Sequence, residues 1–191
     1  MTRFVDRGAI TAAWVGVGMA VTIAVSFLLI IPIEFLYTAI SPLFAGLLIG
    51  YYANSRSERA GGPWGRILGN ALLAGLATGL SFAILLLGVK ALFFSVDAGY
   101  RDASAGGSLT CQSGAGCVYE RHRAFYGDRA LADAGVTDVA SFTSFYWREQ
   151  GATAVTMIVL STGAAIAGGL VYGVTNRRRP QVEGAAPARP A

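Results

Sequence analysis

The sequence contains four long apolar stretches, and each is long enough to cross a lipid bilayer as a helix. They cover residues 10–31, 33–53, 67–94 and 152–174. At a rise of about 1.5 Å per residue, roughly 20 residues cross a hydrocarbon core of about 30 Å. The whole chain is 54% hydrophobic and only 14% charged. The sequence therefore predicts an all-α membrane protein with four transmembrane helices.

Short connections join the first three predicted helices. Pro32 and Glu34 predict a tight turn between the first two, because proline suits the first turn of a helix and a carboxylate is favoured at its positive end. The pair Ser41-Pro42 predicts a kink within the second helix. Residues 54–66 contain glycine, proline and three arginines, a composition typical of a short loop.

The distribution of charge predicts the orientation in the membrane. Residues 1–9, 54–66 and 175–191 together contain nine arginines and three acidic residues, a net charge of +6. Residues 95–150 contain five basic and seven acidic residues, a net charge of −2. Short loops rich in arginine stay in the cytoplasm, so we expect both termini there and residues 95–150 outside. Arginine greatly outnumbers lysine, and both alanine and glycine are abundant. Because this composition is typical of bacterial proteins, we expect the chain to lie in a bacterial inner membrane.

The loop of residues 95–150 is too long to be a plain connection, and we expect it to be partly helical. Its pattern predicts a helix over residues 118–126 and a short one that Asp128 caps and Gly135 ends. A third helix, over residues 138–150 with Thr137 as its cap, is predicted to lie on the outer membrane surface or on the tops of the transmembrane helices.

Cys111 and Cys117 are the only cysteines of the chain, and both lie in this loop. A pair so close in sequence predicts a disulfide on the oxidising side of the membrane. The ring it closes is small, so its expected contribution is about 2 kcal/mol, that of a local staple. The layout is similar to that of animal tetraspan proteins, which also have a large loop between helices three and four. Their CCG motif and further loop cysteines are absent here.

The loop also offers a set of metal-ligand types. Cys111, Cys117 and His122 could bind a borderline metal, with Glu120 or Asp128 as a fourth ligand. The spacing contains no CxxC or HxxxH pair, however, and His122 between two arginines indicates a solvated helix residue. We therefore predict neither a metal, a cofactor nor a catalytic residue.

Two further features lie in the predicted spans. Glu34 and Lys90 both lie near the outer ends of helices, where they are predicted to form an ion pair. Glycines also recur four residues apart, which permits close approach of helix backbones, either within this bundle or against another subunit. These glycines are Gly46 and Gly50, Gly65 and Gly69, Gly75 and Gly79, and Gly169 and Gly173.

These features predict a non-enzymatic accessory or scaffolding subunit that binds a membrane-protein partner, or a second copy of itself, through the outer loop and the glycine faces. Nucleic acid is not an expected partner, because the basic residues are sorted by segment and form no aromatic-interleaved face. A small oligomeric channel or transporter is the first alternative. A loop-based thiol-redox or metal enzyme is the second. Quinone-coupled disulfide-forming membrane enzymes also combine four helices with an outer cysteine pair, but they need a second pair to relay electrons.

Overall fold

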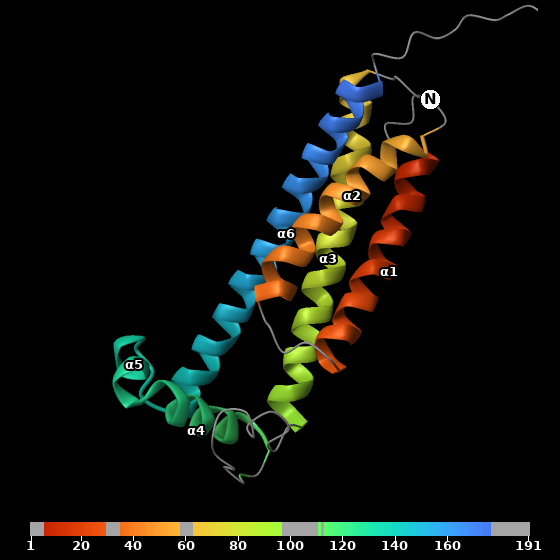
Figure 1. Cartoon of the computed structure of the whole chain (residues 1–191). Coiled ribbons are helices and arrows are strands. Elements are labelled where there is room, and N and C mark those ends of the chain that lie inside the picture. Colours follow the sequence, from red (N-terminus) through yellow and green to blue (C-terminus); the bar gives the residue numbers. More distant parts are fainter. Residues whose placement is uncertain (1–5, 30–34, 58–62, 97–110, 112, 177–191) are drawn as a thin grey trace, which may run out of the picture.

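The computed structural model describes residues 6–29, 35–57, 63–96, 111 and 113–176, and every regular element among them is helical (Figure 1). Four segments are long and apolar enough to cross a membrane, which confirms the predicted class. The elements are α1 (Arg7–Leu29), the π-helix η1 (Leu36–Ile40), α2 (Ser41–Ser55), α3 (Trp64–Val96), α4 (Ala115–Tyr126), α5 (Asp128–Asp133) and α6 (Val139–Asn176).

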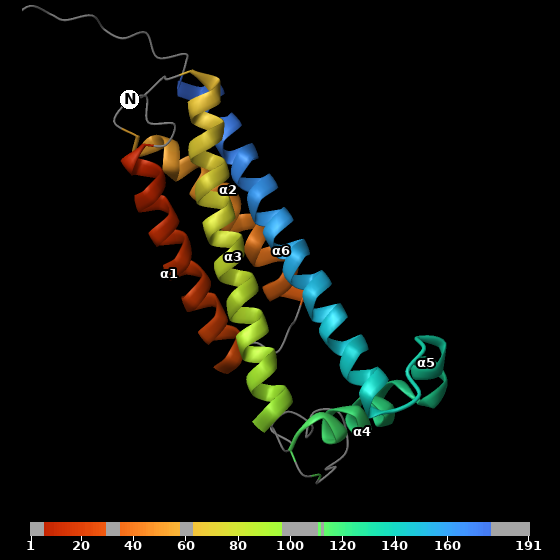
Figure 2. The same cartoon turned by 180° about the vertical axis from the view of Figure 1, so that it is seen from behind.

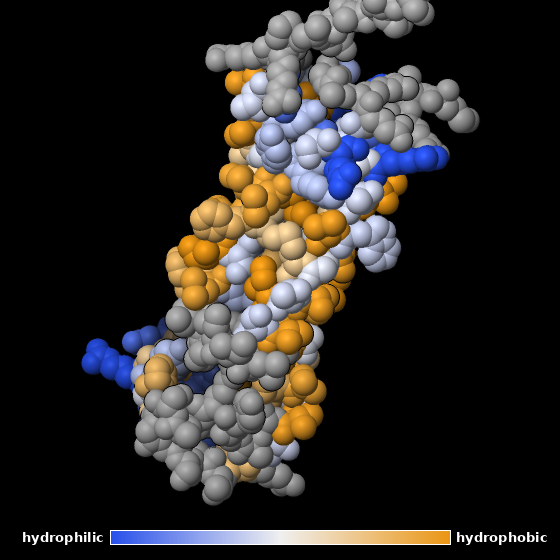
Figure 3. All heavy atoms as spheres, turned by 45° about the vertical axis from the view of Figure 1, so that its right-hand side comes forward, coloured by the Kyte–Doolittle hydropathy of each residue, from blue (hydrophilic) through white to orange (hydrophobic). Residues whose placement is uncertain are grey.

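The four long helices form a bundle in which α2 and α3 pack against each other and against both remaining helices (Figures 1 and 2). Helix α6 runs along one side of this pair, and α1 runs along the other. Large apolar side chains cover the middle of the surface, as lipid contact requires (Figure 3). On α3 they form one continuous row of Leu72, Leu76, Leu80 and Ile84.

A π-helical turn precedes Pro42 in the second span. Proline has no backbone N–H and its ring crowds the preceding turn, so the ordinary hydrogen-bond pattern cannot continue through it. The backbone N–H and the hydroxyl of Ser41 both donate to the Leu36 carbonyl oxygen, the latter over 2.7 Å. These bonds satisfy the carbonyl group in the wider turn. The predicted turn at Pro32 and Glu34 lies outside the described residues.

Helix α6 differs from the prediction, because residues 138–150 and 152–174 do not form two separate helices. One helix runs without a break from Val139 to Asn176. The single glycine between the predicted segments, Gly151, costs a helix about 1 kcal/mol, which is too little to end one with long flanks on both sides. The N-cap of α6 is also one residue later than predicted. Asp138, not Thr137, accepts the backbone N–H of Ser141 over 2.7 Å.

Glycines of α2 bring its backbone into direct contact with α6. A Cβ atom on Gly46 would overlap the carbonyl group of Ser161, and one on Gly50 would overlap that of Ala165. The contact is reciprocal, because a Cβ on Gly168 of α6 would overlap the Leu47 carbonyl of α2. Lipid gives no hydrophobic drive between helices, so such close packing is what holds them together.

The other predicted packing glycines occupy varied surroundings. An added Cβ would come within 2.9 Å of Ile158 at Gly79 and within 2.9 Å of Ala71 at Gly169. At Gly75 and Gly173 it would meet side chains, those of Ala165 and Trp64. Gly65 faces open space and Gly69 is half-buried.

A buried polar cluster ties the helix ends at the pole opposite α4. The Asp6 backbone N–H donates to Asn70 Oδ1 over 3.1 Å, and Asn54 Nδ2 donates to the Ile67 carbonyl over 3.1 Å. The two amide side chains, almost fully buried, contact each other at 3.5 Å, and Ser57 Oγ donates to Asp6 Oδ2 over 2.6 Å. The cluster joins the start of α1, the end of α2 and the start of α3.

The glycine contacts predict a contrast between two methyl additions. Gly50→Ala should lower the free energy of unfolding in detergent by about 1–3 kcal/mol, because backbone atoms of α6 cannot yield to the methyl group. Gly163→Ala is the matched control, since that glycine lies in α6, the helix that Gly50 contacts, and faces open space. Its stability should stay equal or rise slightly. Equal thermal stabilities of the two variants would contradict the packing argument.

Candidate functional site: the aromatic head

The end of the molecule beyond the bundle has a hydrophobic core of its own. We call α4, α5 and residues 139–150 of α6 the head; α4 lies crosswise at the end of the bundle (Figures 1 and 2). Phe142 is completely buried at its centre, and Phe94 at the end of α3 packs against Tyr146 with ring centroids 4.9 Å apart. The other buried residues of this core are Leu131, Val136 and Tyr146.

Glycines with positive φ angles set the path of the chain through the head. Gly127, with φ at +83°, joins α4 to α5, and Gly135, with φ at +78°, follows the end of α5. Residues with a Cβ atom rarely adopt such angles, so the two turns require glycine. The sequence predicted the second of these turns and the helices on either side.

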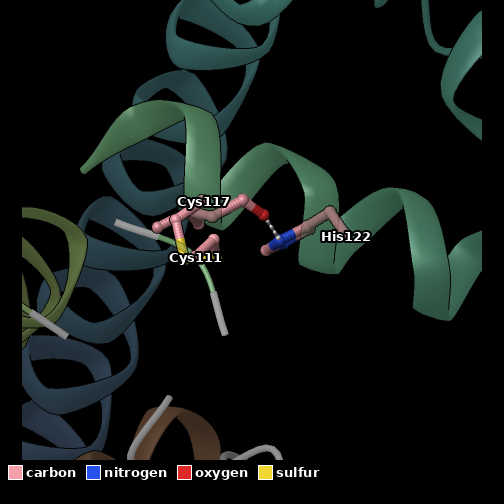
Figure 4. The surroundings of a disulfide bond; sticks show 4 residues. Cys111, Cys117 and His122 are labelled. Carbon is pink, nitrogen blue, oxygen red and sulfur yellow. Dashed lines mark hydrogen bonds between the residues drawn. A yellow bond between two sulfur atoms is a disulfide. The ribbon is translucent and has the colours of Figure 1, made fainter. Parts of the chain in front are cut away.

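The two cysteines tie the segment before α4 to its first turn. Cys111 and Cys117 lie at disulfide distance, with Cα atoms 5.3 Å apart and a bond between their sulfur atoms (Figure 4). Cys117 is buried in the first turn of the helix. The pair therefore anchors the N-terminal end of α4, while the oxidising environment predicted for it stays a prediction.

His122 belongs to the aromatic cluster of the head and is not the solvated residue that its neighbours indicated. Its Nδ1 lies 3.0 Å from the Val118 carbonyl oxygen (Figure 4). A carbonyl oxygen can only accept, so Nδ1 carries the proton in this contact. The ring is half-buried and packs edge-on against Phe142, with centroids 4.9 Å apart.

Three of the residues with metal-ligand chemistry have other partners. The cysteines are bonded to each other, and Asp128 binds Arg123. Among the residues that the structure describes, no group of three or more histidine, cysteine and acidic residues lies close enough to hold a metal ion.

An ion pair bridges the turn between α4 and α5. Both carboxylate oxygens of Asp128 accept hydrogen bonds from the Arg123 guanidinium, one from Nε and one from Nη2, the latter over 3.2 Å. A carboxylate oxygen of Glu120 lies 3.9 Å from Arg123 Nη1. The hydrogen bond from Arg123 holds the pKa of the Asp128 carboxyl below its usual value. Both groups are exposed, so solvent and salt screen the pair and its main effect is on geometry.

An aromatic pair stands exposed at the end of α4. The side chains of Phe125 and Tyr126 are 67% and 60% exposed, and their ring centroids lie 4.8 Å apart. Because aromatic residues are enriched in protein interfaces, this pair is the strongest candidate contact surface of the head. The helix over residues 118–126 was predicted, but its exposed face was not, since the direction of α4 depends on the rest of the head.

The structure describes one member of the predicted Glu34–Lys90 ion pair. Lys90 lies on α3 one turn before Phe94 and is half-buried. Glu34 lies outside the described residues, so their pairing stays a prediction.

Comparison with protein families, curated proteins and solved structures finds no match to this chain. The class of protein therefore rests on the fold. Four apolar helices fit a small, multi-pass integral membrane protein.

The cysteine pair predicts the outcome of thiol labelling. Alkylation of the native full-length chain should find no free thiol, and alkylation after reduction should find two, because both sulfur atoms are bonded to each other. Mass spectrometry of the labelled chain gives the count. Two free thiols in the native protein would contradict both the staple and the sidedness inferred from it.

The cap of α6 predicts a local pH dependence. Hydrogen bonds from the Ser141 backbone N–H and hydroxyl hold the pKa of Asp138 below its ordinary value of 3.8. The ionised carboxylate thus stabilises the folded head fully above that value, and the contribution is lost as the pH falls through the lower, folded-state pKa. Hydrogen exchange over residues 139–145 should show reduced protection at pH 3 relative to pH 5.

Asp138→Asn is the matched control, since asparagine caps helices about as well but does not titrate. Its first turn should keep its protection at pH 3. If this variant loses protection to the same extent as the native chain, Asp138 is not the titrating group.

Proposed function

We propose that this chain is a non-enzymatic accessory subunit that binds another membrane protein through its head. The observation that carries the proposal is the exposed pair of Phe125 and Tyr126 on a folded support. A few aromatic or arginine residues carry most of the affinity in many interfaces. Here two adjacent rings are exposed beside the Arg123–Asp128 ion pair.

The support beneath this pair favours binding. The head has its own core around Phe142, and Cys117 anchors the other end of α4. A surface that is already ordered loses little conformational entropy when it binds, so more of the contact energy becomes affinity.

The interior of the bundle gives less support to a channel or transporter. Two fully buried hydroxyl groups bond to backbone carbonyls: Thr78 Oγ1 donates to Ala74 over 2.8 Å, and Ser161 Oγ donates across helices to Gly75 over 3.2 Å. Groups bonded in this way support helix packing. A thiol-redox enzyme is also less favoured, because the chain contains no second cysteine pair to relay electrons.

The proposal places the chain in a bacterial inner membrane, with both termini in the cytoplasm and the head outside. The excess of arginine in residues 1–9, 54–66 and 175–191 supports this orientation. A partner would then meet the head from the extracytoplasmic side.

The proposal predicts that the chain binds a partner protein and that substitution of Phe125 and Tyr126 weakens this complex. Native mass spectrometry of the chain, extracted gently from its own membrane, should show a complex of fixed stoichiometry. Replacing both Phe125 and Tyr126 by alanine should weaken the complex about thirtyfold or more, since a hot-spot residue contributes about 2 kcal/mol. Phe44→Ala is the control, because Phe44 is 59% exposed but lies on the lipid-facing side of α2.

Three results would contradict the proposal. A lone monomer would exclude an accessory role. A complex of identical chains would indicate self-association. A complex that survives the loss of both head aromatics but not Phe44→Ala would place the contact within the membrane.

A further inference from the structure

Three arginines, Arg7, Arg56 and Arg66, are adjacent in sequence to residues of the buried polar cluster at the pole opposite the head. Gly8 packs against the Arg56 backbone, since a Cβ there would lie 2.7 Å from the Arg56 carbonyl carbon. Arg7 therefore lies beside the end of α2. Arg66 lies one turn before Asn70, which binds the start of α1. Hydrophilic residues gather at this pole of the bundle (Figure 3).

These arginines are not neutralised by the acidic residues in the described part of the chain. The ion pairs found there both involve Arg123 in the head. Asp6, the acidic residue described at this pole, accepts the Ser57 hydroxyl. Arg7, Arg56, Arg66 and Asp6 therefore leave a local net charge of +2.

Two contacts with Tyr52 orient the Arg56 side chain at the end of the apolar span. Its Nε donates to the hydroxyl of Tyr52 over 3.2 Å, and its guanidinium carbon lies 5.7 Å from the centre of the Tyr52 ring. The side chain thus folds back along α2 toward the apolar belt. Its terminal N–H groups form a planar fork that matches the oxygens of a phosphate group.

Below Arg56, the surface of α2 changes from polar to apolar. Tyr52 lies one turn from Arg56, and Leu48 and Phe44 follow at intervals of four residues, so the four side chains form a row that winds by about 120° around the helix. Leu48 and Phe44 are 55% and 59% exposed. A cation, a phenol and two apolar side chains in this order match the headgroup, interface and acyl chain of a phospholipid.

We propose that the phosphate of an anionic phospholipid binds at Arg56, with Arg7 and Arg66 adding positive charge around it. The acyl chains then lie along Leu48 and Phe44. The match of charge selects the anionic headgroup, because an adjacent zwitterionic headgroup carries a cation that the three arginines repel.

The test uses the full chain in detergent, with phosphatidylglycerol and phosphatidylcholine of identical acyl chains as probes. Native mass spectrometry should show tighter binding of phosphatidylglycerol. Arg56→Gln should weaken its binding about fivefold and leave phosphatidylcholine unchanged, since one arginine near an anionic surface contributes about that factor. Tyr52→Phe should weaken phosphatidylglycerol binding by a smaller factor. This variant keeps the aromatic ring under the guanidinium but removes the hydroxyl group that accepts the hydrogen bond from Arg56 Nε.

Arg148→Gln is the matched control. Arg148 lies in the head with its guanidinium carbon 5.9 Å from the centre of the Phe145 ring, the same kind of contact as Arg56 makes with Tyr52. Its loss should not change phosphatidylglycerol binding. The proposal fails if both lipids bind equally, or if Arg148→Gln weakens binding as much as Arg56→Gln. It also fails if millimolar glycerol phosphate displaces the lipid, since the site would then recognise a soluble anion.

Discussion

Backbone contact between α6 and its two neighbours is the interaction on which the bundle depends. In lipid, apolar side chains gain nothing by leaving solvent for another helix, so association relies on how closely the helices fit. Glycines of α2 and α6 bring the two backbones together at Ser161, Ala165 and Leu47. Helix α1 also lies close to α3, but there the contact is with a side chain, because a Cβ on Gly16 would overlap the Thr78 hydroxyl.

Much of this fold could be predicted from the sequence, because membrane spans leave a strong local signal. Four apolar stretches of sufficient length can hardly be anything but helices in lipid. The break predicted near residue 151 was wrong, since a polar segment followed by glycine resembles a helix end in sequence. Neither feature stops a helix whose two halves are each supported by packing, and α6 continues through both.

The candidate site was less predictable, since its geometry comes from contacts between distant segments. Cysteine spacing predicted the staple, and helical periodicity predicted the pieces of the head. His122 gave no sign of its place beside Phe142, which lies in another helix. Similarly, Asn54 and Asn70 belong to no motif. Their hydrogen bonds depend on α2 and α3 meeting at the same pole, which only the folded chain establishes.

The continuity of α6 has a mechanical consequence. This single helix of 38 residues, about 57 Å long, contains no proline and connects the core of the head to the opposite pole. Its glycine contacts with α2 and α3 lie between those two ends. A displacement of the head along the axis of α6 is therefore carried to the opposite pole without a break in the helix.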